Sequence, residues 1–522
     1  MLVSSYSAVA DESFDGYAFV GADFIAESEG CTRFRSSGGS IGPGEDGCYT
    51  IFRRTSSGYE AGTDARGLQK LYLYREGGSW AVGSSLHDLV SHLRVHHAAL
   101  TPNLAVLRAL GVRQALTAQL NSTHTIFHEI ELVPSFCTVH IDETGPQIIP
   151  LPSRYASSGY EEALAQHLFM WRSRFATLTS DPRTTFVADL SGGLDSRVVF
   201  AFVHASGVLA DGSDRVQIAS QERMPKDFAA ATTIAREHGV NLNGAAKPMR
   251  TPTSPEGAIE NWKHHSLGVY MPAYLSPHVF DPLSVRCHGA GGGTFRDIFT
   301  GTSLRNRLMS TKNNFEDGTF EEYSSIVLDD LEALSALRPD VDPQKLHYRE
   351  FRNRFHFGHA PQTRTTFSPL NSILVDDIAD RPDADDRRTY FDLMDSLVPG
   401  LKNLPYDDPS KAPKRHTPSD AARRMAQIHG APGRVFADLR EGEADKRHQR
   451  QAFSLFYSMA ARAVSSSTVQ EIIGDARILT RTRRFLLEVQ EQSGRPRANA
   501  PGHQDASYVI TAAFAAGEDL GA

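Results

Sequence analysis

One segment constrains the fold of this chain more than any other: residues 191–197, with the sequence Ser-Gly-Gly-Leu-Asp-Ser-Arg. It joins a strand-like run, Phe186–Leu190, to a helical run that begins near Arg197. Glycine lets the backbone approach a polyanion, and the N-terminus of the following helix favours negative charge. We therefore predict a phosphate-binding loop here, and we call residues 191–196 the first glycine loop.

The side chains of the first glycine loop suit the same kind of ligand. Ser191 and Ser196 supply hydroxyl donors without bulk, and Asp195 is placed to hold the divalent cation that accompanies phosphates. The alternative is an accidental turn, for which a glycine pair after a strand would be enough. The strand and helix patterns on either side favour the phosphate-binding interpretation.

The residues around this loop predict an α/β domain. An amphipathic helix is expected over 160–178, because apolar side chains recur there at spacings of three and four. After the loop, a strand is expected over 215–219 and a helix over 227–238. Alternating strands and helices build a parallel sheet that binds ligands at the carboxyl ends of its strands.

The length of the chain predicts more than one domain. A chain of 522 residues is too long for a single core. Residues 1–152 hold short alternating and aromatic runs between glycine and serine clusters, which is typical of strands. Residues 158–490 hold the α/β pattern with large helical additions, and residues 491–522 are expected to form a flexible C-terminal tail.

Composition argues against several kinds of partner. The formal net charge is −8 and no long Lys/Arg run occurs, so nucleic acid is not expected as a partner. No apolar stretch approaches the roughly 18 residues that a membrane helix needs. The four cysteines form no CxxC pair and the N-terminus lacks a basic signal region, so we expect a cytoplasmic protein.

Residues 191–196 also follow the pattern Ser-Gly-Gly-x-Asp-Ser. With this motif the chain resembles the asparagine-synthetase-like amide ligases, a branch of the ATP pyrophosphatase superfamily. The resemblance covers most of residues 70–410 and implies a β-rich, degenerate amidohydrolase-like domain before an α/β ATP-pyrophosphatase domain. The further segments that carry it are Trp80–Ser85, Phe127–Pro134, His288–Gly292 and Ser368–Asn371.

The resemblance implies an activity and a set of site residues. Such ligases activate a carboxylate as its acyl-adenylate, release pyrophosphate, and let an amine displace AMP, with ATP and Mg²⁺ as cofactors. Ile218 and Gly289 would flank the adenosine, and Arg197 would add charge to the site or be solvated. Leu190 would also belong to the cofactor-binding residues. The residues that would hold pyrophosphate and magnesium are Ser191, Gly192, Gly193, Asp195 and Ser196, with Asp195 as the metal ligand.

The chain departs from the family at its N-terminus. Glutamine-dependent members use a cysteine directly after the initiator methionine, whereas this chain has Leu2 there and no cysteine before Cys31. Residues 1–152 are therefore expected to be a degenerate glutaminase-like (Ntn-type) domain. The amine would be ammonia or part of a substrate, as in the β-lactam synthetases and lasso-peptide cyclases, and a partner protein that delivers it remains an alternative.

A second departure concerns the nucleotide site. The family carries an acidic pair where this chain has Gly293 and Thr294, so one metal ligand is missing unless Asp297 replaces it. This leaves open a second interpretation, in which the chain is a nucleotide-binding or regulatory protein that has lost turnover. The sequence does not identify the acyl substrate, so asparagine formation, lactam closure and macrolactam formation all remain possible reactions.

Four further positions are candidates for catalysis. Alignment on the Ser368–Asn371 turn puts Asp376 where the family carries a functional glutamate, although it is equally suited to cap a helix. Lys411 lies in an open, proline-rich segment where the family has a mobile lysine that neutralises charge in the transition state. In the β-lactam branch of the family, a tyrosine and a glutamate together deprotonate the amine, and Tyr348 and Glu350 are residues of these two types. Residues two apart in the sequence, however, point to different faces of a helix.

Overall fold

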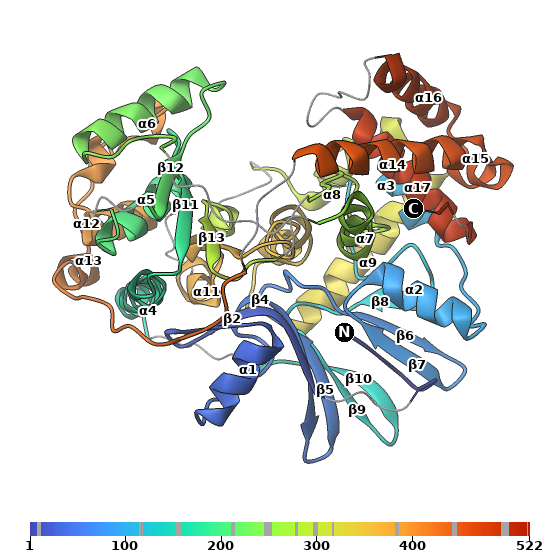
Figure 1. The fold of residues 1–522 in the computed structure, drawn as a ribbon, viewed down its shortest axis with the longest axis horizontal. Helices are drawn as coiled ribbons and strands as arrows, with labels where there is room; N and C mark the ends of the chain where they lie inside the picture. Colours follow the sequence, from blue (N-terminus) through green and yellow to red (C-terminus); the bar gives the residue numbers. More distant parts are fainter. Residues whose placement is uncertain are drawn as a thin grey trace.

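The computed structural model describes residues 1–7, 12–113, 116, 118–152, 158–209, 214–244, 253–276, 280–295, 301–315, 318–381, 386–440, 446–491, 501–518 and 520–521. The protein is a mixed α/β structure with three sheets in this part of the chain. Figure 1 shows two mainly antiparallel sheets at the base, an α/β unit above them on one side, and a helical region on the other.

The N-terminal part contains two sheets. One has seven strands in the order β10-β9-β5-β4-β2-β3-β15, and the other has four in the order β1-β7-β6-β8. The helices are α1 (Glu27–Ser36), α2 (Leu86–Val95) and α3 (Leu104–Leu110). The strands are β1 (Leu2–Ser4), β2 (Ser13–Val20), β3 (Asp23–Ala26), β4 (Asp46–Thr55), β5 (Gly58–Thr63), β6 (Tyr72–Glu76), β7 (Ser79–Gly83), β8 (Ile130–Leu132), β9 (Cys137–Asp142) and β10 (Gly145–Pro150).

The period-two pattern of β6 explains how these sheets are layered. Leu73 points into an apolar cluster shared with Phe52 of the seven-stranded sheet, whereas Tyr72 and Tyr74 point into a cluster shared with helices. Successive side chains of a strand face opposite sides of its sheet. The four-stranded sheet is therefore covered by the other sheet on one face and by helices on the other.

The third sheet contains the strand before the first glycine loop. Its strands are β11 (Thr185–Asp189), β12 (Val216–Ala219), β13 (Ser284–Cys287) and β14 (Thr366–Phe367), all parallel, in the order β12-β11-β13-β14. The sequence prediction of a parallel sheet is thus confirmed. The helices around it are α4 (Tyr160–Ser180), α5 (Leu194–Ala205), α6 (Pro225–Glu237), α11 (Ile373–Ala379), α12 (Asp386–Leu397) and α13 (Asp420–Met425).

The strand order creates a switch point. From β11 the chain passes through α5 to β12 on one side, and it later returns as β13 on the other side of β11. The loops after β11 and β13 therefore leave the sheet next to each other at its carboxyl edge. In open α/β sheets this is where ligands bind.

The helical region packs against the N-terminal part. It comprises α7 (Pro255–Ser266), α8 (Leu304–Met309), α9 (Thr319–Leu337), α10 (Pro343–His347), the π-helix η3 (Tyr348–Phe357), α14 (Lys446–Ser465), α15 (Ser467–Ile473), α16 (Ala476–Glu491) and α17 (Pro501–Ala516). Short 3-10 turns are η1 (Gly292–Phe295), η2 (Lys312–Asn314), η4 (Pro369–Asn371), η5 (Leu401–Asn403) and η6 (Pro409–Lys411).

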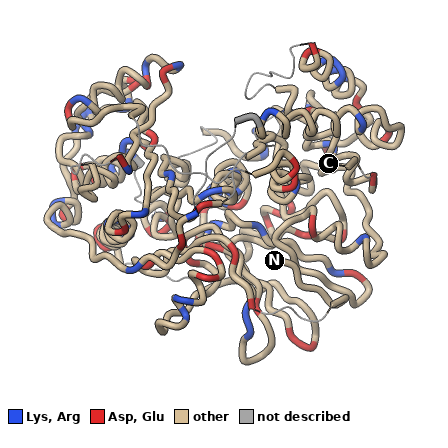
Figure 2. The backbone as a smooth tube through the Cα atoms, in the orientation of Figure 1, with Lys and Arg blue, Asp and Glu red and all other residues tan. Residues whose placement is uncertain are grey.

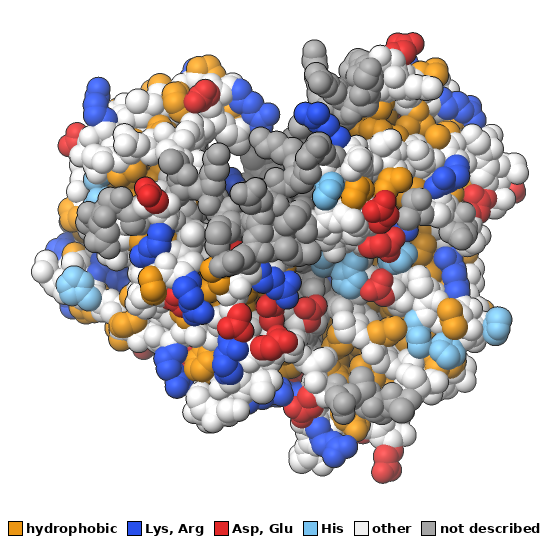
Figure 3. All heavy atoms as spheres, viewed as in Figure 1, with side chains coloured by type: hydrophobic (Ala, Val, Ile, Leu, Met, Phe, Trp, Pro, Cys, Tyr) orange, Lys and Arg blue, Asp and Glu red, His pale blue; other side chains and the backbone are white. Residues whose placement is uncertain are grey.

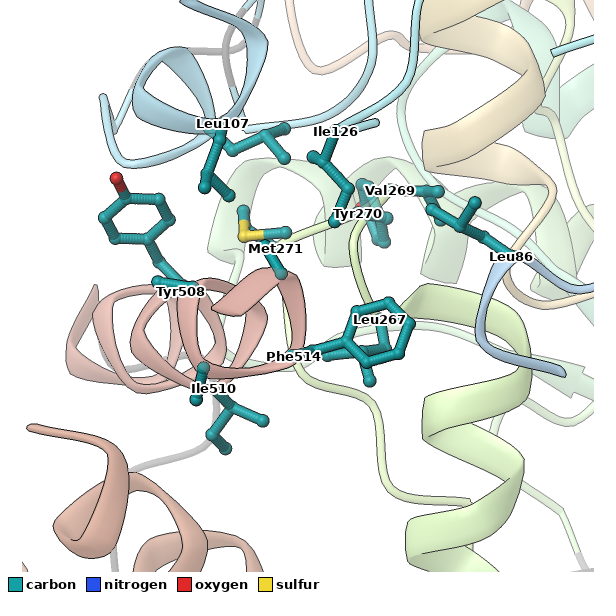
Figure 4. Packing of buried hydrophobic residues seen from close by; sticks show 14 of the residues in the cluster. Leu86, Leu107, Ile126, Leu267, Val269, Tyr270, Met271, Tyr508, Ile510 and Phe514 are labelled. Carbon is teal, nitrogen blue, oxygen red and sulfur yellow. The ribbon is translucent and has the colours of Figure 1, made fainter. Parts of the chain in front are cut away.

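Helix α17 corrects the expectation of a flexible tail over 491–522. Tyr508, Ile510 and Phe514 are buried in the same apolar cluster as Leu107 and Met271 (Figure 4). The Pro/Gly-rich composition before residue 501 suggested flexibility, but the apolar run that follows it forms a core helix. Residues 492–500 themselves lie outside the described part of the chain.

Contacts join the N-terminal sheets to the α/β unit. Strand β15 (Val435–Phe436) adds to the seven-stranded sheet beside β3, and Asp46 of β4 forms a buried ion pair with Arg174 of α4, with an N–O distance of 2.6 Å. All four cysteines are buried free thiols. Charges of both signs are interspersed along the chain and over the visible face (Figures 2 and 3), and every described helix is too short or too polar to cross a bilayer.

Candidate functional site

The first glycine loop meets a second one at the switch point. We call residues 288–294, which follow β13, the second glycine loop. A Cβ atom on Gly289 would lie 2.5 Å from Cβ of Asp195 and 2.8 Å from the Ser196 nitrogen. Only glycine allows this approach to the first turn of α5. The family resemblance pointed to both loops, and the structure brings them into contact.

The first glycine loop is held by its own hydrogen bonds. The Ser191 amide donates to Ser196 Oγ at 3.0 Å, and the Gly193 amide donates to Ser191 Oγ at 3.2 Å. The Gly192 amide donates to Asp227 Oδ1 of α6 at 3.0 Å. These amides already have partners, so a phosphate here would meet the serine hydroxyls and the N-terminus of α5, or displace Asp227.

Space remains at one position of this loop. Among the described residues, a Cβ atom on Gly193 would have a single neighbour within 4 Å, Ser191 Oγ at 3.4 Å, whereas one on Gly192 would lie 2.5 Å from Cβ of Asp407. Gly193 also starts α5 as its N-cap, with extended backbone. The protein itself therefore does not need glycine at 193, and the open space there suits a ligand.

Asp195 lies in the first turn of α5 between the two loops. Its carboxylate accepts a hydrogen bond from the Tyr390 hydroxyl of α12, which also lies 3.3 Å from the Gly292 carbonyl. Gly292 packs against the same carboxylate, since a Cβ there would overlap it. Asp195 is thus fixed by contacts from α12 and from the second glycine loop.

A cavity of about 480 Å³ opens beside Asp195. Within it, the Tyr274 and His359 rings stack with centroids 4.1 Å apart, and the Tyr270 hydroxyl lies 2.8 Å from His356 Nδ1 at its edge. Among the lining residues that the structure describes, Asp195 is the one carboxylate. They are Asp195, Tyr274, His288, Gly289, Ala290, Gly291, Gly292, Gly293, Tyr348, Arg352, Asn353, His356, Phe357, His359 and Ala360.

The histidines of the cavity are uncharged at neutral pH. Burial lowers the pKa of His288 to about 3, helped by Arg286 and Arg364, and burial lowers that of His356 to about 4. Burial likewise lowers the pKa of His359 to about 3. Desolvation favours the neutral imidazole because it penalises the charged form. The remaining positive charge in the lining belongs to Arg352.

A segment from residue 401 to 411 lies against the first glycine loop. Arg197 is fully buried and donates to the carbonyls of Leu401, Leu404 and Pro405 at 2.5–3.1 Å. Arg197 therefore neither faces a ligand nor lies in solvent, the two roles expected for it. The Asp407 amide of this segment donates to the Gly192 carbonyl at 3.3 Å.

Lys411 is close to the loop but paired within the segment. Its Nζ lies 2.6 and 2.8 Å from the two carboxylate oxygens of Asp407. Because Asp407 contacts Gly192, the lysine charge is held one residue away from the first glycine loop. Release from Asp407 is required before Lys411 can contact a phosphate.

Asp376 lies apart from the cavity. Its carboxylate accepts hydrogen bonds from Arg66 at 2.8 and 2.9 Å, and Arg349 lies 3.1 Å away. Glu350 also points elsewhere, accepting from the Ser135 amide at 2.8 Å. The separation expected between Tyr348 and Glu350 is confirmed, since Tyr348 lines the cavity.

Leu190 and Ile218 are structural neighbours of the site. Both are buried, the Leu190 amide donates to the Ala219 carbonyl at 2.8 Å, and Ile218 pairs with Ala188 across β12 and β11. Ile218 thus lies on the opposite side of β11 from Gly289. The structure brings Ser191, Gly192, Gly193, Asp195, Ser196 and Gly289 together, with Lys411 nearby.

Sequence reasoning missed the contacts that come from distant elements. Tyr390, Asp407 and Arg352 lie in helical or proline-rich stretches without any local motif. Asp227 gave a signal through its position in the helix that follows the second strand of the α/β pattern, where it lies in the first turn of α6. The described residues hold no group of three or more His, Cys, Asp or Glu side chains suited to a metal ion.

Comparison with models of known protein families and with curated proteins found no match.

Proposed function

We propose that this protein is an ATP-dependent amide-forming ligase of the asparagine-synthetase type, without glutaminase activity. It would activate a carboxylate as its acyl-adenylate, release pyrophosphate, and transfer the acyl group to ammonia or a substrate amine. The observation that carries the proposal is the meeting of two glycine loops at a sheet switch point, with Asp195 between them and a cavity beside it. The resemblance of the Ser191–Ser196 motif supplies the reaction class.

The proposal assigns each part of the site a task. The Ser191 and Ser196 hydroxyls and the N-terminus of α5 bind the pyrophosphate portion of ATP, because donors and the helix dipole favour an anion there. Lys411 adds positive charge once it leaves Asp407. The cavity holds the acyl substrate, and Asp376, bound by two arginines, keeps the α11 region in place.

The residues present fit a magnesium ion that is shared with ATP. Mg²⁺ keeps several waters and needs one or two carboxylates together with substrate phosphates. Asp195 is such a carboxylate, and Tyr390 fixes its orientation. Bound there, the ion would neutralise charge on the departing pyrophosphate.

We also propose the finer architecture. Residues 1–152 would be a degenerate glutaminase-like domain and residues 158–490 the ligase domain, in a cytoplasmic protein. The amine would come from ammonia, from the substrate itself or from a partner protein. The contacts across the two parts, such as Asp46 with Arg174, support a structural role for the N-terminal part.

The test is release of pyrophosphate from ATP and Mg²⁺ with a panel of carboxylates. We expect release that requires one class of carboxylate and that Asp195→Asn abolishes. Asp340→Asn is the matched control, because the Asp340 side chain is 64% exposed and pairs with Arg338. Equal release by the wild-type and Asp195→Asn proteins would refute the proposal.

A nucleotide-binding protein without turnover is the second candidate, and one observation favours it. A Cβ atom on Gly293 would overlap the Tyr348 ring, and Thr294 is fully buried. An acidic side chain at position 293 would therefore require the Tyr348 ring to move, and one at position 294 would be buried, while Asp297 lies outside the described residues. ATP binding in a calorimeter, combined with no pyrophosphate release across the panel, would favour this candidate.

A further inference from the structure

We infer that Arg352 binds a second carboxylate of the acyl substrate, one that is not activated, and that it thereby selects the substrate. The inference rests on the proposed function, because it takes the cavity as the acyl pocket. It goes further by naming a chemical class: the ligand carries an anionic carboxylate beside a planar group. A free dicarboxylic acid and a peptide with a free C-terminus both have this chemistry.

Arg352 is partly buried, and it differs in its partners from three fully buried arginines that form ion pairs. Arg66, Arg174 and Arg349 each form an ion pair with an aspartate at 2.6–2.8 Å. Within the described residues Arg352 forms no ion pair, and its polar contact is a hydrogen bond to Gln119 Oε1 at 3.3 Å. A cation in a protected site without a counter-charge costs stability. Retaining it there is explained by a ligand that supplies the negative charge.

The surroundings of Arg352 leave its charge uncompensated. The imidazoles of His288, His356 and His359 are neutral, and burial raises the pKa of Tyr270 and Tyr274, so these phenols stay protonated. Asp195 is committed to Tyr390 at the glycine-loop end of the cavity. Among the described residues that line the cavity, Arg352 is therefore the one side chain that presents a positive charge.

Aromatic rings and a β-bridge lie around Arg352. Gln119 pairs with Tyr270 in a short β-bridge, and the Tyr270 hydroxyl contacts His356. The stacked Tyr274 and His359 rings form an aromatic wall of the same cavity. An arginine fork held beside aromatic faces suits a planar carboxylate or peptide group.

The experiment compares each acid with its amide. Glutarate and its monoamide represent a free dicarboxylic acid, and N-acetyl-aspartyl-glycine and its C-terminal amide represent a peptide. Binding to the full chain is measured by calorimetry with Mg²⁺ and a non-hydrolysable ATP analogue. The proteins are the wild type, Arg352→Gln, Arg352→Lys and the surface control Arg338→Gln.

We expect the wild type to bind the acid of at least one pair about tenfold or more tightly than its amide, as a charge-assisted hydrogen bond provides. Arg352→Gln should remove this preference, Arg352→Lys should restore part of it, and Arg338→Gln should keep it. Affinity for the ATP analogue should stay unchanged in all four proteins. The pair that shows the preference identifies the source of the carboxylate.

Three results would overturn the inference: no preference for either acid, no binding of either acid, or an Arg352→Gln protein that loses affinity for the ATP analogue instead. Pyrophosphate release is measured in parallel with ATP. An Arg352-dependent preference without any release would refute the proposed function and leave anion binding by Arg352 in place. Pyrophosphate release without an Arg352-dependent preference for an acid would support the proposed function and refute the role of Arg352.

Discussion

Replacing Gly193 by alanine separates the demands of the fold from those of a ligand. The added methyl group would have one protein neighbour, Ser191 Oγ at the ordinary contact distance of 3.4 Å, and the backbone φ of −84° suits alanine. Alanine is a poorer N-cap than glycine but reduces the entropy of the unfolded chain, so the unfolding free energy should change by less than about 1 kcal/mol. The variant should fold normally.

Binding of ATP should respond quite differently. If a phosphate approaches the backbone at Gly193, the methyl group occupies its place and costs a contact worth about 1.5–3 kcal/mol, a loss of roughly tenfold to a hundredfold in affinity. Gly289→Ala is the contrasting variant, because its Cβ would lie 2.5 Å from Cβ of Asp195 and should destabilise the fold. Calorimetric titration with ATP and thermal unfolding distinguish the two. An unchanged ATP affinity in Gly193→Ala would refute a phosphate at this loop.

Three further predictions concern the fold. Arg197→Met should lower the unfolding free energy by about 3 kcal/mol in denaturant titrations, because it removes a charged donor from the buried carbonyls of segment 401–411. Burial lowers the pKa of His167 to about 3. Below about pH 6.5 the unfolded chain therefore binds a proton at this histidine that the folded chain does not bind. The unfolding free energy should fall between about pH 6.5 and about pH 3, and it should fall less steeply in His167→Leu. Deleting residues 501–522 should prevent folding, as circular dichroism would show, because α17 fills an apolar core.

The sequence predicted local structure well where one segment carries its own signal. The expected helix over 160–178 is α4, the expected strand over 215–219 contains β12, and the helix expected over 227–238 overlaps α6. In each case the periodicity of apolar residues reports directly on the buried face. The prediction of a flexible tail over 491–522 was wrong because the Pro/Gly-rich stretch carries no information about the apolar helix that follows it.

The site was predictable only as far as its motifs reach. The glycines at 192, 193 and 289 indicate that another group approaches the backbone closely, but the sequence does not identify that group. The structure shows that Asp407 occupies the space beside Gly192 and that the first turn of α5 occupies the space beside Gly289. The catalytic role predicted for Asp376 rests on its distance in sequence from the Ser368–Asn371 turn. Sequence distance does not reveal that two arginines bind its carboxylate.

The arrangement around Asp195 links the two halves of the proposed reaction. Tyr390 bonds to Asp195 and lies 3.3 Å from the Gly292 carbonyl, and Gly292 lines the cavity that also contains Arg352. A ligand that fills the cavity must therefore rest on the same loop that positions the carboxylate proposed to hold magnesium. Because Gly289 and Gly292 pack directly on Asp195, a shift of the second glycine loop moves that carboxylate or breaks its bond to Tyr390. In the proposed reaction, occupancy of the cavity would thus be coupled to the geometry at the phosphates, and a correct substrate would complete the site.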